Sequence, residues 1–322
     1  MSQGPTRRMV LGAAAAAALP APVFAQGAQT LNIVATTSML ADTVRMLAGA
    51  QVRVEALMGE GVDPHLYRPT RADIVKMTQA DLVIAHGLNL EAQFRETFTQ
   101  LARRRPAVLA AEAIPKEQLL KDDEVPDKPD PHVWMDPKLW AVVVRSVALA
   151  LVGVNVPNRR KVTPDLEPTL AKVEALGVYA GEVLSSVPAE RRVLVTAHDA
   201  FNYMARAHNL EVHGIQGIST ESEAGLKAIE ATVELVVSRK IPAVFVESSV
   251  SDRNIRAVIE GAARRGHQVK IGAELFSDAM GKPGSYEGTY VGMIDHNVTA
   301  IARALGGNAP EKGMSGRLAH TG

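Results

Sequence analysis

The chain has 322 residues, 47% of them hydrophobic, so it can bury a large core and is long enough for two domains. Its 35 basic and 35 acidic residues give no net charge, which leaves no basic excess for binding nucleic acid and no long single-sign run for a membrane surface. Because there is no cysteine, disulfides, thiolate metal ligands, thiol nucleophiles and an N-terminal lipid-modified cysteine are excluded, and any metal site must use His, Asp or Glu.

Residues 1–25 have the pattern of an export signal. Arg7 and Arg8 form a positive n-region, an Ala-rich apolar stretch follows, and "VFA" at 23–25 has the small residues that signal peptidase prefers. The apolar stretch is too short to span a bilayer, and "TRRMVL" is similar to a twin-arginine signal. We therefore expect a periplasmic protein that begins near Gln26, is secreted by a cleaved signal peptide and is not a lipoprotein.

From residue 26 to residue 157, strand-like runs alternate with helical patterns. Short β-branched or apolar runs predict strands, and apolar residues at helical spacing predict helices. The predicted strands are 30–37, 52–58, 80–87 and 106–112, and the predicted helices are 38–49, 70–80, 89–102 and 136–152. Thr70 and Asp73 have capping-box spacing, while Asp136 and Pro137 suit the N-cap and first position of a helix.

Residues 158–187 break this alternation, because they hold no strand-like run and predict one helix of roughly 20 residues. The alternation then resumes, with strands at 191–198, 210–215, 242–249 and 268–275 and helices at 200–209, 223–240, 254–266 and 290–305. We therefore predict an α/β fold with two (β/α) lobes, each a mainly parallel sheet flanked by helices, joined by one long rigid helix. The N-terminal lobe is 26–157, the bridging helix 158–187 and the C-terminal lobe 188–322. The polar residues 116–130 predict an exposed loop.

Four potential metal ligands lie close to predicted strand ends. His65 and Asp278 come shortly after strands, His198 ends one, and His132 lies between a strand and a helix. Ligands of open parallel sheets bind beyond the carboxyl ends of the strands, so a cleft between the lobes would bring these side chains together. Three neutral imidazoles and a carboxylate suit zinc, and a bidentate Asp would also admit manganese.

Each of these residues also has a plain structural interpretation. A His after Asp-Pro can be a polar turn residue, and a His or Asp at a strand end can simply satisfy local hydrogen bonds. His86 competes for a place in the site, because it too ends a strand, in "LVIAHG". Asp63, Asp130 and Asp199 are candidates to receive the second ring N–H of a ligand histidine.

Several blocks together resemble the zinc/manganese-type solute-binding proteins of ABC importers, and most closely the TroA-like members. These blocks are "GVDPHLYRPT", "ADLVIAHGLNLEAQF", "DPHVWMDP", "VTAHDAFNYMARAHNLEVHGIQGISTESEAG", "VFVESS" and "SDAMG...YEGTYVGMIDHN". They lie between about residues 30 and 305, in the order and spacing of the family. The resemblance implies four metal ligands, which are His65, His132, His198 and Asp278. It also implies two α/β lobes bridged by one long helix, which permits little hinge closure.

By this resemblance the protein is a monomeric periplasmic receptor, and no enzyme, that needs no organic cofactor. It would capture Zn²⁺ or Mn²⁺ as its transported ligand and deliver the ion to an inner-membrane ABC permease. Residues 116–130 lack the histidines that many zinc-specific relatives carry there, and the choice between the two metals stays open. The alternative is a secreted zinc-dependent hydrolase in which three His bind zinc and Asp278 acts as a general base. Metal affinity should fall below about pH 6.5, where imidazoles gain protons.

Overall fold

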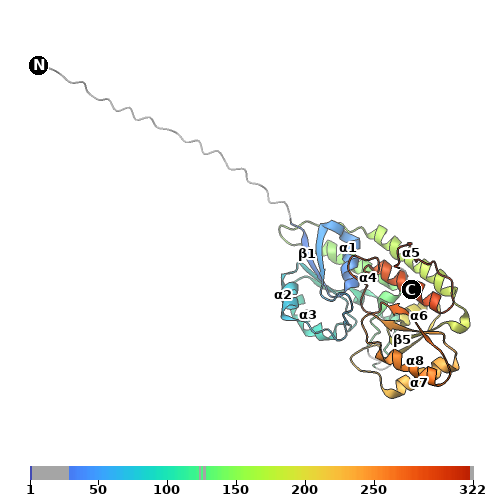
Figure 1. Ribbon diagram of the computed structural model, residues 1–322. Coiled ribbons are helices and arrows are strands. Elements are labelled where there is room, and N and C mark those ends of the chain that lie inside the picture. Colours follow the sequence, from blue (N-terminus) through green and yellow to red (C-terminus); the bar gives the residue numbers. More distant parts are fainter. Residues whose placement is uncertain (2–28, 123–124, 126–127, 320–322) are drawn as a thin grey trace.

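The computed structural model describes residues 1, 29–122, 125 and 128–319. The predicted export signal therefore lies outside the described residues, apart from Met1. Among the described residues, no helix combines the length and the apolar character that crossing a membrane requires. Figure 1 shows two α/β halves that pack side by side, with the blue to green elements in one half and the yellow to red elements in the other.

A four-stranded parallel sheet forms the N-terminal half. In spatial order its strands are β2 (Val52–Ala56), β1 (Leu31–Ala35), β3 (Leu82–Ala85) and β4 (Ala107–Leu109). Its helices are α1 (Ser38–Ala48), α2 (Arg71–Gln79), α3 (Arg95–Ala102) and α4 (Pro137–Gly153). Because all four strands run parallel, their carboxyl ends share one edge of the sheet. The four predicted strands are confirmed.

The predicted helix starts at α2 and α4 are also confirmed. At α2 the Thr70 side chain accepts the backbone N–H of Asp73, and the Asp73 carboxylate accepts the backbone N–H of Thr70. At α4 the Asp136 side chain accepts the backbone N–H of Lys138, with Pro137 as the first helical residue. These caps satisfy backbone donors that no helical carbonyl can reach.

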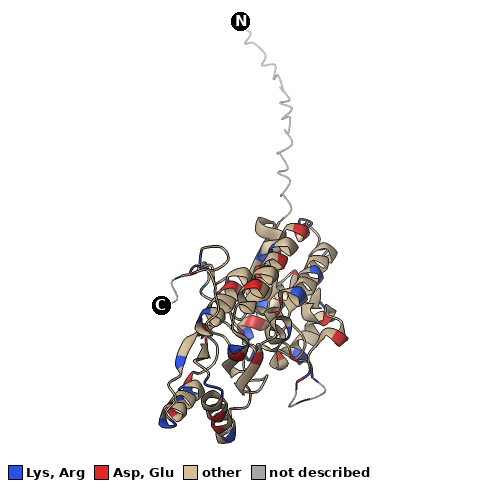
Figure 2. Cartoon of the chain, turned by 90° about the vertical axis from the view of Figure 1, so that its right-hand side faces the viewer, with Lys and Arg blue, Asp and Glu red and all other residues tan. Residues whose placement is uncertain are grey.

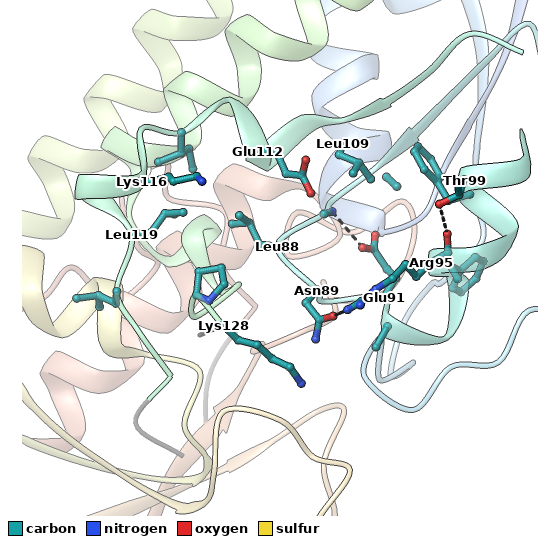
Figure 3. A pocket seen from close by; sticks show the side chains of 18 of the residues that line it. Leu88, Asn89, Glu91, Arg95, Thr99, Leu109, Glu112, Lys116, Leu119 and Lys128 are labelled. Atoms are coloured by element: carbon teal, nitrogen blue, oxygen red, sulfur yellow. Dashed lines mark hydrogen bonds between the residues drawn. The ribbon is translucent and has the colours of Figure 1, made fainter. Parts of the chain in front are cut away.

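The helix predicted at 89–102 begins later, at Arg95 in α3. Gly87, Leu88 and Asn89 have φ of 86°, 52° and 65°, which a right-handed helix cannot contain. The buried carboxylate of Glu91 accepts the backbone N–H of Gly87 and holds this left-handed turn in place. The turn borders a cavity of about 870 Å³ (Figure 3), whose lining includes none of the four predicted metal ligands.

Two pairs of parallel strands form the C-terminal half. Strand β5 (Val193–His198) pairs with β6 (Glu211–Gln216), and β7 (Ala243–Glu247) pairs with β8 (Lys270–Leu275). Strands β5 and β7 contact each other. The helices are α6 (Asn202–His208), α7 (Leu226–Ser238), α8 (Arg253–Arg264) and α9 (Tyr290–Ala304). The predicted α/β class with parallel sheets flanked by helices is therefore confirmed.

The long helix predicted between the halves is α5 (Leu166–Ser185), 20 residues in length. It packs against α4 of the N-terminal half and against α6 and α9 of the C-terminal half. One continuous hydrophobic core includes buried residues of both halves, among them Trp134, Leu176 and Tyr290. Separating the halves would expose this core, so the packing favours small relative movements. The domain boundaries at residues 157 and 187 stay a prediction.

The prediction of an exposed loop at 116–130 is wrong at the C-terminal end of this range. Asp130 has no exposed surface, and an isolated β-bridge between Lys121 and Pro129 closes the loop. The reason lies in Asp130 itself, because its carboxylate is bonded to a histidine in the centre of the molecule.

Candidate metal centre

Four side chains from four separate connections converge between the two halves. His65 lies in the connection from β2 to α2, and His132 directly precedes a short 3-10 turn at Val133–Met135. His198 is the last residue of β5, and Asp278 follows the end of β8 by three positions. The structure thus brings together all four predicted residues, two from each half.

The distances within this cluster suit one small cation. The Nε2 atom of His132 lies 3.3 Å from Nε2 of His65 and 3.4 Å from Nε2 of His198. The Asp278 carboxylate places Oδ1 3.4 Å from Nε2 of His132 and Oδ2 3.2 Å from Nε2 of His198. In a tetrahedral zinc site with bonds of about 2.0–2.2 Å, neighbouring ligand atoms are about 3.3–3.6 Å apart. These four pairs have the spacing of ligands around one ion, and all four ligand atoms lie within 4.8 Å of one another.

The Asp278 carboxylate is the strongest sign that this cluster binds a cation. Both of its oxygens are buried, and neither accepts a hydrogen bond from any described residue. Burial alone would raise the pKa of Asp278, but the imidazoles of His198 and His132 hold that pKa well below its usual range. A buried carboxylate without hydrogen bonds is costly, so a cation between it and the imidazoles would compensate for its lost hydration.

Asp130 orients the ring of His132. Its Oδ1 atom accepts the ring Nδ1–H of His132 at 2.8 Å and the backbone N–H of the same residue at 2.9 Å. A proton fixed on Nδ1 leaves the lone pair of Nε2 pointing into the cluster. From α6, the Tyr203 hydroxyl donates to the backbone carbonyl of Asp130 at 2.7 Å, and the Asn202 side-chain amide donates to Oδ2 of its carboxylate at 3.3 Å. The predicted role of Asp130 is confirmed.

Glu247 has the same role for His198, and the sequence analysis missed it. The buried carboxylate accepts Nδ1–H of His198 at 2.5 Å and the backbone N–H of His198 at 2.8 Å. Glu247 ends the apolar strand β7, so a search for polar residues at strand ends would have found it.

The prediction that Asp199 or Asp63 accepts the second ring N–H of a ligand histidine is wrong. Asp199 has a buried oxygen without a hydrogen-bond partner among the described residues, and it does not reach the His198 ring. Asp63 accepts the backbone N–H of His65 at 2.8 Å instead of a ring N–H.

His86 is not one of the four clustered residues, but it contacts the turn that precedes His132. Its ring has no exposed surface, lies beside Trp134 and Trp140, and donates Nε2–H to the Pro131 carbonyl at 2.8 Å. Burial lowers the pKa of His86 to about 3, so the ring is neutral. Its hydrogen bond fixes the turn that precedes His132.

The three clustered histidines differ in proton affinity. Burial lowers the pKa of His65 to about 3. Burial also acts to lower the pKa of His132, but Asp130 and Asp278 outweigh it and raise that pKa to about 9. Glu247 and Asp278 likewise raise the pKa of His198 well above its usual value, against the effect of burial. At neutral pH a metal ion must therefore displace protons from the two carboxylate-supported imidazoles.

A buried set of three imidazoles and a carboxylate, held between two α/β halves, is the kind of site that holds a divalent metal ion. The family described as ZnuA, zinc-uptake complex component A periplasmic, matches residues 33–304, so the chain belongs to this family of metal-binding solute-binding proteins of ABC importers. These are extracytoplasmic transport binding proteins and not enzymes. The hydrolase alternative is therefore wrong.

Individual relatives agree with this assignment. The zinc-binding protein TroA of Treponema pallidum is 44% identical over 273 residues, which is 85% of this chain and 88% of the relative. The manganese-binding lipoprotein MntA of Bacillus subtilis is 39% identical over 277 residues, 86% of this chain and 90% of the relative. The solved structure of the periplasmic zinc-binding protein TroA has a TM-score of 0.80 at 42% identity and covers 86% of this chain and 99% of that chain.

Proposed function

We propose that this protein captures a divalent transition metal, Zn²⁺ or Mn²⁺, in the periplasm and delivers it to an inner-membrane ABC permease. The observation that carries the proposal is the convergence of His65, His132, His198 and Asp278 around one buried point. These four side chains bind the ion without covalent chemistry or an organic cofactor. None of the four is more than 4% exposed, so the bound ion is sheltered from competing ligands during transport.

The donor set supports binding of both metals, with zinc preferred. Three imidazole nitrogens favour zinc over manganese at equal free concentration, as the Irving–Williams order expects. The two oxygens of Asp278 face different imidazoles, at 3.4 and 3.2 Å, so that both can bind one ion and raise its coordination number. A higher coordination number with more oxygen suits manganese. Relatives named for each metal support this dual capacity.

The protein acts as a monomer exported by the signal at residues 1–25. In the view of Figure 2, ribbon positions of Lys and Arg are interspersed with those of Asp and Glu. With 35 basic and 35 acidic residues, the sequence has no basic excess that would attract nucleic acid. The continuous core around α5 supports a small opening movement for ion exchange, in place of a wide hinge.

Calorimetric titration of metal-free protein with Zn²⁺ and Mn²⁺ tests the proposal. We expect one ion per chain, and at least a hundredfold loss of affinity for each of His65→Ala, His132→Ala, His198→Ala and Asp278→Ala. His267→Ala is the matched control, because this ring lies outside the cluster and bonds the Ile241 carbonyl. Elemental analysis of protein taken from the native periplasm identifies the cargo. Wild-type affinity in a cluster variant would remove that residue from the site, and a wild-type chain that binds neither ion would refute the proposal.

A further inference from the structure

The buried cluster poses a problem of access. The four side chains are at most 4% exposed, so an ion cannot reach them unless part of the surrounding structure moves. The hydrogen bonds behind each ligand indicate which part moves most easily, because an element with few such bonds opens at lower cost.

Of the three ligands other than His65, two are held by hydrogen bonds to a buried carboxylate, and the segment of the third is bonded to the opposite half. His132 is fixed by Asp130, and His198 by two hydrogen bonds from its backbone and ring to Glu247. The segment of Asp278 is tied to the N-terminal half, because the buried Trp134 donates its indole N–H to the Ser277 carbonyl at 2.8 Å. These three ligands thus form a preorganised frame across both halves.

His65 lies in a segment of a different kind. The connection between Ala56 and Arg71 has no helix or strand over residues 57–70, and connections of this length in compact domains are usually functional. Within 59–66, only Pro64 and His65 are buried.

Residues 59–66 have few hydrogen bonds to other described parts of the chain. Apart from the ring contact of His65 with His132, residues 59–66 have a single hydrogen bond to another part of the described chain. In it the Thr220 hydroxyl donates to Oδ2 of Asp63 at 2.6 Å. The other oxygen of Asp63 accepts the backbone N–H of His65 at 2.8 Å. Asp63 therefore connects Thr220 directly to the backbone of a ligand.

Thr220 belongs to the opposite half, in the connection from β6 to α7. It is only 7% exposed, and its connection is fastened to the end of β6 because Gln216 donates to the Ser222 carbonyl at 3.1 Å. The bond from Thr220 to Asp63 therefore joins a fixed donor in one half to a sparsely anchored segment in the other.

We propose that Thr220 and Asp63 are positioning residues that hold His65 against the other three ligands, and that the ion enters and leaves as residues 59–66 swing away. This inference rests on the proposed function and adds its route of exchange. Breaking the Thr220–Asp63 bond frees His65 while the preorganised frame stays intact. Release of the ion therefore requires movement of residues 59–66 and leaves the other three ligands in place.

The rate of zinc release tests this route with an isosteric pair of variants. Zinc-loaded protein is mixed with excess chromogenic chelator in a stopped-flow instrument. Thr220→Val lacks the hydroxyl and should release zinc about 10–150-fold faster, the range that corresponds to the loss of a hydrogen bond to a charged group. Thr220→Ser restores the hydroxyl and should stay within about twofold of wild type. Thr78→Val is the matched control and should also match wild type, because the Thr78 hydroxyl donates to the Val75 carbonyl within α2.

Hydrogen exchange separates opening of the segment from a general loss of structure. In Thr220→Val the amides of residues 59–66 should exchange faster, while those of β5 and β7 keep wild-type protection. Release from Thr220→Val at the wild-type rate, or equal acceleration in Thr220→Ser, would overturn the positioning role while leaving the proposed function intact. If the wild-type chain binds no zinc in the calorimetric titration, the proposed function and this inference fail together.

Discussion

Replacing Glu247 by Gln tests whether the carboxylate behind His198 prepares the ring for metal. Glu247 is 4% exposed and accepts two N–H groups of His198, at 2.5 and 2.8 Å. Each carboxylate oxygen of Glu247 accepts one of these N–H groups. The side-chain amide of Gln has only one oxygen, so it cannot accept both N–H groups in the same way. If its NH₂ group instead donates to Nδ1, the ring proton moves to Nε2, where it blocks the metal.

Either arrangement weakens metal binding. Loss of a carboxylate that orients a ligand histidine typically costs 10–100-fold in metal affinity, or about 1.4–2.7 kcal/mol. We expect a Zn²⁺ dissociation constant raised by this factor for Glu247→Gln in a competition titration with a chromogenic chelator. The same substitution at Glu260 of α8, outside the cluster, is the control and should leave the constant unchanged. A dissociation constant for Glu247→Gln within threefold of wild type would refute the reasoning.

Three further predictions concern pH, stability and ligand removal. Asp130 and Asp278 outweigh burial and raise the pKa of His132 to about 9, so its proton must leave before metal binds. Zinc affinity, measured by titration at a series of pH values, should therefore rise at least tenfold per pH unit between pH 7 and pH 9. Above pH 9 it should rise less steeply. A flat profile above pH 6.5 would contradict this. Tyr203→Phe strands the Asp130 carbonyl and the Leu120 N–H, and should lower the free energy of unfolding in urea by about 1–3 kcal/mol. Free zinc at 100 times its dissociation constant should raise that free energy by about 2.7 kcal/mol in wild type, and chelation or His132→Ala should abolish the increment.

Local patterns placed the four converging side chains near strand ends, and the family resemblance singled them out from competitors such as His86. His198 ends a continuous apolar strand, and Asp278 comes just after another, so the parallel-sheet rule placed both at the same edge. The two-residue spacing made Asp130 a candidate partner of the His132 ring, but it did not distinguish Asp130 from Asp63, which has the same spacing from His65 and accepts its backbone N–H instead.

Contacts between distant strands and loops were out of reach. Glu247 could be found as a polar residue at a strand end, but its pairing with His198 could not, because that pairing depends on β7 lying beside β5 and strand order is not encoded in local periodicity. The sequence separation of 157 between Asp63 and Thr220 hides their bond in the same way. The left-handed backbone at Leu88 was also unpredictable, since a leucine rarely adopts positive φ and the surrounding pattern is helical. From the usual pKa of histidine we expected metal affinity to fall below about pH 6.5. In the folded structure, carboxylates beside His132 raise its pKa to about 9, so protons compete with metal at a higher pH.

The most direct test of the metal centre is anomalous X-ray diffraction from crystals of the zinc-loaded protein, recorded on both sides of the zinc absorption edge. We expect one strong peak per chain, about 2.0–2.2 Å from Nε2 of His65, His132 and His198 and from the Asp278 carboxylate. A zinc peak at another histidine, with no peak between these four side chains, would contradict the account.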